Sequence, residues 1–320
     1  MQSCKYIYGP VLSRRLGRSL GVDVIPFKTC SYDCVYCLLG RTTCHTLEVK
    51  EYVPAADVLA EIKQRLKEDT PDAISFAGSG EPTLNSRLGE IVDGIKALTD
   101  IPVVVFTNAS LLWKPEVRAN LARVDIISPS LDAVLPAAAQ AVNRLCDGLD
   151  VEEVYRGLQK FCREYKGRIW LEVLLVAGVN DSDADIDALR KAVQGLSNIE
   201  RIQLNTVVRP PAEKSAHALA PARLKEIAAR LPGRVEIIAS TIGSEQVPHA
   251  HKEVSCEEVA GLLERHPSTA AGIAAGLGTD AESIRPVLEQ LLQKKKIAEE
   301  DRDGREFYIC CPGTESGPSS

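Results

Sequence analysis

The stretch that decides the fold is Cys30-Ser31-Tyr32-Asp33-Cys34-Val35-Tyr36-Cys37, which closely follows the apolar run GVDVIP at residues 21–26. A strand that leads into this segment places all three thiols on one loop between a strand and a helix. Three thiolates on so short a loop can ligate three irons of a four-iron cluster and leave the fourth iron open for chemistry. The same spacing leaves a structural zinc open as an alternative, completed by Cys44 or His45.

The rest of the first 245 residues alternates between short apolar runs and amphipathic helical segments. Six further apolar runs follow the first, at residues 72–77, 101–107, 124–130, 169–178, 202–208 and 234–238. This alternation predicts an α/β fold with a parallel sheet whose ligand sites lie at the C-terminal ends of the strands. A barrel, open or closed, and a doubly wound sheet both fit the pattern.

A second, smaller unit is predicted after a polar linker at residues 240–253. Its elements are three helices and a hairpin, at residues 257–266, 267–278, 280–296 and 298–309. This order is typical of a winged-helix domain, which we place at residues 252–311. Residues 312–320 are expected to be a disordered tail.

Composition and charge limit the class of protein. The chain has 45% hydrophobic and 26% charged residues and a formal net charge of −6, which argues against a generally basic, phosphate-binding surface. The third helix of the second unit carries Asp280, Glu282 and Glu289 against Arg285, so DNA binding is not favoured. Docking against the barrel, or binding of a protein or peptide, is the favoured role of this unit. The N-terminus has no signal-peptide pattern and no stretch approaches a membrane span, so we expect a cytoplasmic protein without membrane contact.

The second apolar run ends in a glycine-rich turn, Ala77-Gly78-Ser79-Gly80-Glu81-Pro82-Thr83. Glycines there let a ligand approach the backbone, and a carboxylate beside them can take an amine. The motif CxxxCxxC, with an aromatic residue before its last cysteine and this turn one strand later, resembles the radical S-adenosylmethionine superfamily. Residues 8–23 are similar to a branch related to the wybutosine-biosynthesis enzymes, and the resemblance covers roughly residues 6–240.

The resemblance implies a partial (β/α)6 TIM-like barrel that binds a [4Fe-4S] cluster through Cys30, Cys34 and Cys37. It also implies that S-adenosylmethionine is cleaved to a 5′-deoxyadenosyl radical, with an electron donor such as flavodoxin or ferredoxin. The residues that match the family's cofactor-binding positions are Tyr36, Gly80, Glu81, Thr107, Asn108, Ser130, Asp132 and Arg144. Each has a structural alternative, such as a core aromatic, a turn, a helix cap or, for Arg144, a surface ion pair.

The substrate is less defined by the sequence than the cofactors are. Arg14, Arg15 and Arg18 near the barrel entrance could bind a phosphate or carboxylate, or be solvated arginines with buried stems. Asn205 and Arg209, at the end of the sixth strand, are further candidates. A tRNA base, a peptide or protein and a small metabolite all stay open as substrates, and no catalytic residue is assigned. The competing class is a non-catalytic, zinc-stabilised regulator that binds DNA or a partner through the winged helix.

Overall fold

The computed structural model describes residues 4–239, 254–302 and 304–311. Within them, eight strands form one sheet in the order β1-β2-β5-β6-β7-β8-β9-β10. Strands β2 to β10 run parallel to their neighbours, and β1 pairs antiparallel with β2. The strands are β1 (Ile7–Ser13), β2 (Gly17–Val22), β5 (Ala73–Phe76), β6 (Val103–Thr107), β7 (Ile126–Pro129), β8 (Arg168–Leu175), β9 (Ile199–Thr206) and β10 (Val235–Ile237).

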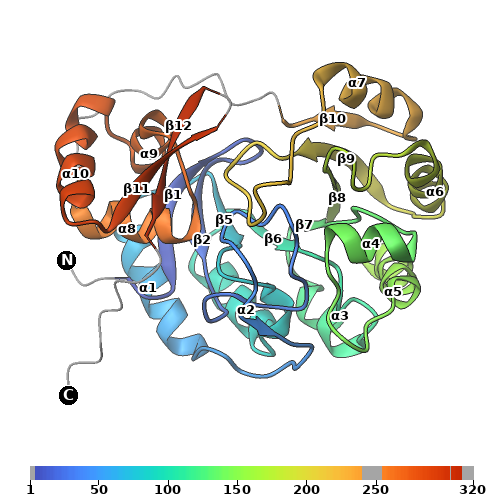
Figure 1. Cartoon of the computed structure of the whole chain (residues 1–320). Helices are drawn as coiled ribbons and strands as arrows, with labels where there is room; N and C mark the ends of the chain where they lie inside the picture. The colour runs from blue at the N-terminus through green and yellow to red at the C-terminus, as the bar shows by residue number, and fades with distance from the viewer. Residues whose placement is uncertain (1–3, 240–253, 303, 312–320) are drawn as a thin grey trace.

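Helices cover the outer face of this sheet and surround it in Figure 1. They are α1 (Ala55–Glu68), the short 3-10 helix η1 (Pro82–Leu84), α2 (Leu88–Leu98), α3 (Pro115–Leu121), α4 (Pro136–Val142), α5 (Val151–Glu164), α6 (Asp183–Gln194) and α7 (Pro221–Arg230). Their apolar faces pack on the outward-facing strand residues, as Val58 and Ile62 of α1 do in the main core. Each fully buried aliphatic side chain of this kind contributes about 1.5–3 kcal/mol.

The inner face of the sheet carries a small apolar cluster and several charged and polar side chains. Val104, Ile126 and Trp170, from three neighbouring strands, form a separate apolar cluster there. Arg14 and Arg15, in the turn between β1 and β2, reach across this face. Arg14 donates to the carbonyl of Ile238 beyond β10, although β1 and β10 lie at opposite ends of the strand order. The sheet is therefore curled around its interior, as in a partial barrel.

The C-terminal unit packs against the edge strand of this sheet. It contains α8 (Cys256–Arg265), α9 (Ala270–Leu277), α10 (Ala281–Gln293) and the hairpin of β11 (Ile297–Arg302) and β12 (Arg305–Cys310). Tyr8 and Val11 of β1 belong to its hydrophobic core, and the unit lies beside β1 in Figure 1. A Cβ on Gly276 of α9 would lie 2.7 Å from the Pro10 carbonyl oxygen, so glycine permits this close contact.

The α/β partial-barrel prediction is confirmed by the curled parallel sheet. The antiparallel strand β1 was not predicted, because its residues contain Gly9-Pro10 and do not form an uninterrupted apolar run. The helix, helix, helix, hairpin order is present, while the assignment of this unit to the winged-helix class and the domain boundaries stay predictions.

The linker at 240–253 and the tail at 312–320 lie outside the described residues. Among the helices described, none is long and apolar enough to cross a lipid bilayer.

Candidate functional site

The three cysteines lie on the loop that leaves the C-terminal end of β2. Cys30 ends the two-residue strand β3 (Thr29–Cys30), which pairs with β4 (Cys44–His45) and fixes the start of the loop. The loop is held from the other side by α4, because the Val35 amide donates to the Val142 carbonyl at 3.0 Å. All three thiols are free and partly exposed. They are thus presented together at the end of the sheet where ligands of parallel sheets bind.

Each of the three sulfurs lies beside an N–H donor of a neighbouring side chain. Asn108 Nδ2 lies 3.6 Å from Cys30 Sγ, and Asn143 Nδ2 lies 3.4 Å from Cys34 Sγ. The buried ammonium of Lys28 lies 3.3 Å from Cys37 Sγ. Donors and a cation beside thiolate sulfurs stabilise their negative charge, and they tune iron–sulfur centres. The loop therefore fits an anionic iron–thiolate centre.

Burial favours the protonated form of the Cys30 and Cys34 thiols. Burial, and secondarily the Glu81 carboxylate, raises the pKa of Cys30 to about 12. Burial raises the pKa of Cys34 well above its ordinary value. A metal centre that binds these sulfurs would have to displace their protons, so binding should release protons to solution.

The zinc alternative lacks its fourth ligand. His45 Nε2 lies 3.0 Å from the Ser31 carbonyl oxygen, and Cys44 is exposed. No group of three or more His, Cys, Asp or Glu side chains converges on a single ion position within the described chain. A cubane cluster does not require such convergence, because each cysteine ligates a different iron. The loop therefore fits a four-iron cluster better than one zinc ion.

The glycine-rich turn after β5 packs against the cysteine loop. The Glu81 amide donates to the Thr29 carbonyl at 3.3 Å. A Cβ on Gly80 would lie 1.7 Å from that same carbonyl oxygen, so no other residue fits there without movement of the loop. The buried Asp23 carboxylate also holds this turn, because it accepts hydrogen bonds from Ser79 Oγ at 2.5 Å and from the Ser79 amide at 3.3 Å. The turn and the loop thus form one rigid unit.

Glu81 uses its carboxylate to join this turn to the end of β6. It accepts from Thr107 Oγ1 at 2.6 Å, from the Asn108 amide at 2.7 Å and from the Thr83 amide at 3.1 Å. Burial raises its pKa, and these hydrogen bonds oppose that shift. Glu81, Thr107 and Asn108 are therefore brought together as the sequence predicts, with Asn108 extending the chain of contacts to Cys30.

A second buried carboxylate lies on the other side of the loop. Asp132 accepts from Tyr36 Oη, from Asn143 Nδ2 at 2.8 Å and from the Leu174 amide at 2.9 Å. Burial raises the pKa of Asp132 to about 6. Ser130 lies next to it, in a bridge with Glu172 of β8. The structure thus places Tyr36, Ser130 and Asp132 in one region, beside the loop cysteines.

Arg144 has ion-pair partners of its own. Its guanidinium lies 2.8 Å from Glu213 and 3.5 Å from Asp33. Hydrogen bonding to Glu213 raises its pKa. These contacts correspond to the ion-pair alternative for this residue.

The candidate substrate residues divide into two groups. Arg14 and Arg15 lie on the inner face of the sheet, where Arg14 Nη1 donates to Asn205 at 3.3 Å and Arg15 pairs with Glu172 at 2.7 Å. Burial, and then the nearby charges of Arg14 and Arg15, lowers the pKa of Arg209. Arg18 does not join them: it is the second residue of β2, beside the same turn, and its side chain pairs with Asp69 at 2.5 Å.

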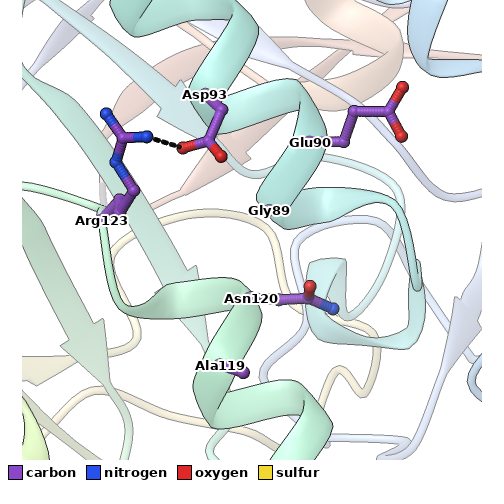
Figure 2. A pocket seen from close by; sticks show the side chains of 6 residues that line it. All are labelled: Gly89, Glu90, Asp93, Ala119, Asn120 and Arg123. Atoms are coloured by element: carbon purple, nitrogen blue, oxygen red, sulfur yellow. Dashed lines mark ion pairs between the residues drawn. The ribbon is translucent and has the colours of Figure 1, made fainter.

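A pocket elsewhere on the surface does not belong to this site. Figure 2 shows it between α2 and α3, on the outer helical layer, with Glu90 and Asn120 among its lining residues. Its charged pair, Arg123 and Asp93, is self-compensating at 3.1 Å. A crevice lined by Ser130, Asp132 and Asn143, among others, lies beside the cysteine loop. The crevice beside the cysteine loop is therefore the candidate site, because the thiols and the buried carboxylates lie next to it.

Several residues of the site could not be identified from the sequence. Lys28, Asn143 and Asp23 have no motif that marks them, and Arg265 lies in the C-terminal unit. Arg265 pairs with Asp23 at 2.8 Å and so reaches the carboxylate that holds Ser79. The position of Lys28 two residues before Cys30 was the one available signal, since a cation near thiolates is expected at such sites.

Comparison with known proteins gives consistent matches. The model of the family described as "Radical SAM superfamily" matches residues 24–193. The protein named "GTPase Obg" of Brachyspira hyodysenteriae is 35% identical over 94% of this chain, which spans only 44% of that protein's length. A "UPF0026 protein" of Helicobacter pylori is 32% identical over 94% of this chain and 96% of its own length.

Solved structures share the fold. A radical SAM methyltransferase from Sphaerobacter thermophilus aligns with a TM-score of 0.50 and 20% identity, over 68% of this chain and 66% of that one. At this identity the likeness concerns the fold alone. The chain contains no Gly-Lys pair and hence no P-loop of the GxxxxGK type, so GTP binding does not transfer from the name of the Brachyspira relative.

Proposed function

Because the chain belongs to the radical SAM superfamily, we propose that it cleaves S-adenosylmethionine reductively and abstracts hydrogen from an organic substrate. The observation that carries this proposal is the set of three N–H contacts to the sulfurs of Cys30, Cys34 and Cys37. Three cysteines alone fit several metals. Cysteines with a side-chain N–H donor beside each sulfur, on a loop beside a buried glycine–glutamate turn, fit an anionic redox cluster.

Enzymes of this superfamily use a [4Fe-4S] cluster and S-adenosylmethionine. The residues that would hold the cluster here are Cys30, Cys34 and Cys37. When bound, the reduced cluster supplies the electron that splits the sulfonium bond of S-adenosylmethionine and yields a 5′-deoxyadenosyl radical. The role of this chain is then to hold the reactants together and to keep water and stray hydrogen donors away.

The residues around the loop are proposed to position S-adenosylmethionine. Gly80 lets the turn lie directly against the cysteine loop, so the methionine end can approach both. Glu81 would face the methionine ammonium and at the same time fix Thr107 and Asn108 through its hydrogen bonds. Tyr36 would pack near the adenine, and its hydroxyl is held by Asp132.

Ser130 and Asp132 would line the ribose and methionine side. Arg144 is the weakest of the proposed cofactor residues, because Glu213 already compensates its charge. Radical SAM enzymes generally need a reductant, and a flavodoxin or ferredoxin is proposed here. Whether the substrate is an RNA base, a peptide or a small metabolite is not fixed by these residues.

The test is anaerobic reconstitution with iron and sulfide, followed by dithionite and S-adenosylmethionine. A brown protein with about four irons per chain, forming 5′-deoxyadenosine, is the expected result. Cys34→Ser should lose both iron and product, whereas the matched variant Cys44→Ser should keep both. Colourless protein with one tightly held zinc, or a well-loaded cluster without 5′-deoxyadenosine, would overturn the proposal and favour the non-catalytic alternative.

A further inference from the structure

Three arginines crowd the interior of the curled sheet. Arg14 and Arg15 come from the β1–β2 turn, and Arg209 follows the C-terminal end of β9. The Arg15 guanidinium stacks on the Phe106 ring at 4.4 Å, which places it over the inner face of β6. The three cations therefore converge from two distant segments on one region.

This region has more positive than negative charge. Among the described residues that bond to these arginines, Glu172 is the one carboxylate, and Arg15 forms an ion pair with it at 2.7 Å. Arg14 donates only to neutral oxygens, those of Asn205 and Ile238. Arg209 has no hydrogen bond or ion pair with any described residue. Two guanidinium groups are thus uncompensated within the described part of the chain.

Burial and the mutual repulsion of these cations disfavour their charged forms. Burial, and then the charge of Arg15, lowers the pKa of Arg14 to about 10. Burial, with Arg14 and Arg15, lowers the pKa of Arg209 to about 9. Placing like charges together in a partly desolvated region is unfavourable unless an anion compensates them.

The C-terminal unit contributes a neutral partner to the same region. His266 follows α8, and burial together with Arg209 and Arg14 lowers its pKa well below the ordinary value. Its Nδ1 lies 2.8 Å from Ser268 Oγ. The adjacent Arg265 pairs with Asp23, which holds Ser79 of the glycine-rich turn. His266 is therefore joined through its neighbour to the turn proposed to bind S-adenosylmethionine.

A buried hydroxyl on the same inner face also lacks a partner. Ser128 lies two residues beyond Ile126 of the inner cluster, so its side chain points to the same side of β7. Its Oγ is buried and has no hydrogen-bond partner among the described residues. An unpaired buried hydroxyl is costly, which again indicates that polar atoms of a ligand or of water belong there.

We propose that Arg14 and Arg209, with His266 beside them, bind an oxyanion of the substrate, a phosphate or a carboxylate group. Guanidinium groups match both anions in geometry and charge. The assignment of this anion to the substrate rests on the proposed function; the anion site itself does not. The C-terminal unit then completes the substrate site instead of serving as a separate binding module.

The experiment is calorimetric titration of the reconstituted full chain with inorganic phosphate and, separately, with acetate. Saturable binding of at least one probe is expected, and the tighter probe identifies the anion class. Arg209→Gln and Arg14→Gln should each weaken that binding by about tenfold or more, the worth of a charge-assisted contact. The matched control is Arg168→Gln, which removes a guanidinium paired with Glu200 at the other end of the sheet and should bind as the wild type does.

Arg209→Lys keeps the positive charge but removes the planar guanidinium group with its paired donors. It should therefore lose part of the affinity for the anion, which separates a binding role from misfolding. Absence of saturable binding to the wild type, or binding unchanged in both glutamine variants, overturns the anion site. The two proposals fail separately in the wild-type protein. If the protein binds the anion but forms no 5′-deoxyadenosine, the anion site is supported and the radical function is overturned. If it forms 5′-deoxyadenosine but binds no anion, the radical function is supported and the anion site is overturned.

Discussion

Replacing Gly80 by alanine tests whether the cysteine loop and the glycine-rich turn act as one rigid unit. The new Cβ would lie 1.7 Å from the Thr29 carbonyl oxygen and 2.7 Å from its carbon. Real Cβ contacts essentially never fall below 3.0 Å, so the two segments must separate by about 1.3 Å. Because the clashing atom is backbone, no side-chain rotation relieves it, and Thr29 precedes Cys30 directly.

The expected cost of Gly80→Ala is about 1–3 kcal/mol, or a thermal midpoint lower by about 2–6 °C. A displacement of about 1 Å at a reacting centre costs about a hundredfold in rate, so 5′-deoxyadenosine formation should fall by that order. Iron content per chain and S-adenosylmethionine affinity are measured alongside, to show whether the cysteine loop or the cofactor contact fails first.

Gly261→Ala is the matched control. Gly261 lies within α8, and no atom lies within 4 Å of the position of its Cβ. Alanine there should be neutral or stabilise the protein by up to about 1 kcal/mol. A Gly80→Ala protein with wild-type midpoint, iron content and rate would refute the reasoning, because the turn and the loop would then be free to separate.

Other perturbations address the metal ligands, the C-terminal contact and its histidine. Cys34→Ser should abolish iron binding while Cys44→Ser, at an exposed thiol, leaves it unchanged; equal iron content in both variants contradicts the ligand assignment. Arg265→Met leaves the buried Asp23 carboxylate unpaired and should cost about 3–5 kcal/mol in denaturant unfolding, with partial recovery when Asp23→Asn is added; strictly additive losses would mean that the pair is not coupled. The folded-state pKa of His266 lies below its unfolded value, so the unfolded chain binds more protons and stability should be lost as pH falls through about 6.5. His266→Gln should make the unfolding midpoint less dependent on pH between pH 7 and 5. An unchanged pH dependence of that midpoint would exclude this histidine as its source.

The sequence by itself determined that three thiols share one short loop, and it determined the general architecture. The spacing of Cys30, Cys34 and Cys37 is local, so a motif of eight residues suffices to place the thiols together. The alternation of apolar runs predicted the parallel sheet, since parallel strands need helical crossovers. The same pattern predicted that the glycine-rich turn after β5 and the end of β6 at Thr107 lie close together, because the C-terminal ends of parallel strands meet at one edge.

Only the tertiary structure decided which side chains support that loop and which arginines converge. Asn108 and Asn143 reach the sulfurs of Cys30 and Cys34 from segments far apart in the chain, and such pairing is not encoded in any local spacing. Lys28 contacts Cys37 from within the same loop. Arg14 and Arg18 are four residues apart at one turn, yet the Arg14 side chain crosses the sheet interior to Ile238, whereas the Arg18 side chain pairs with Asp69. Strand β1 also provides the edge on which the C-terminal unit packs, and this shared core is what brings His266 to the arginines. Such contacts depend on how the sheet curls, a property of all its strands together.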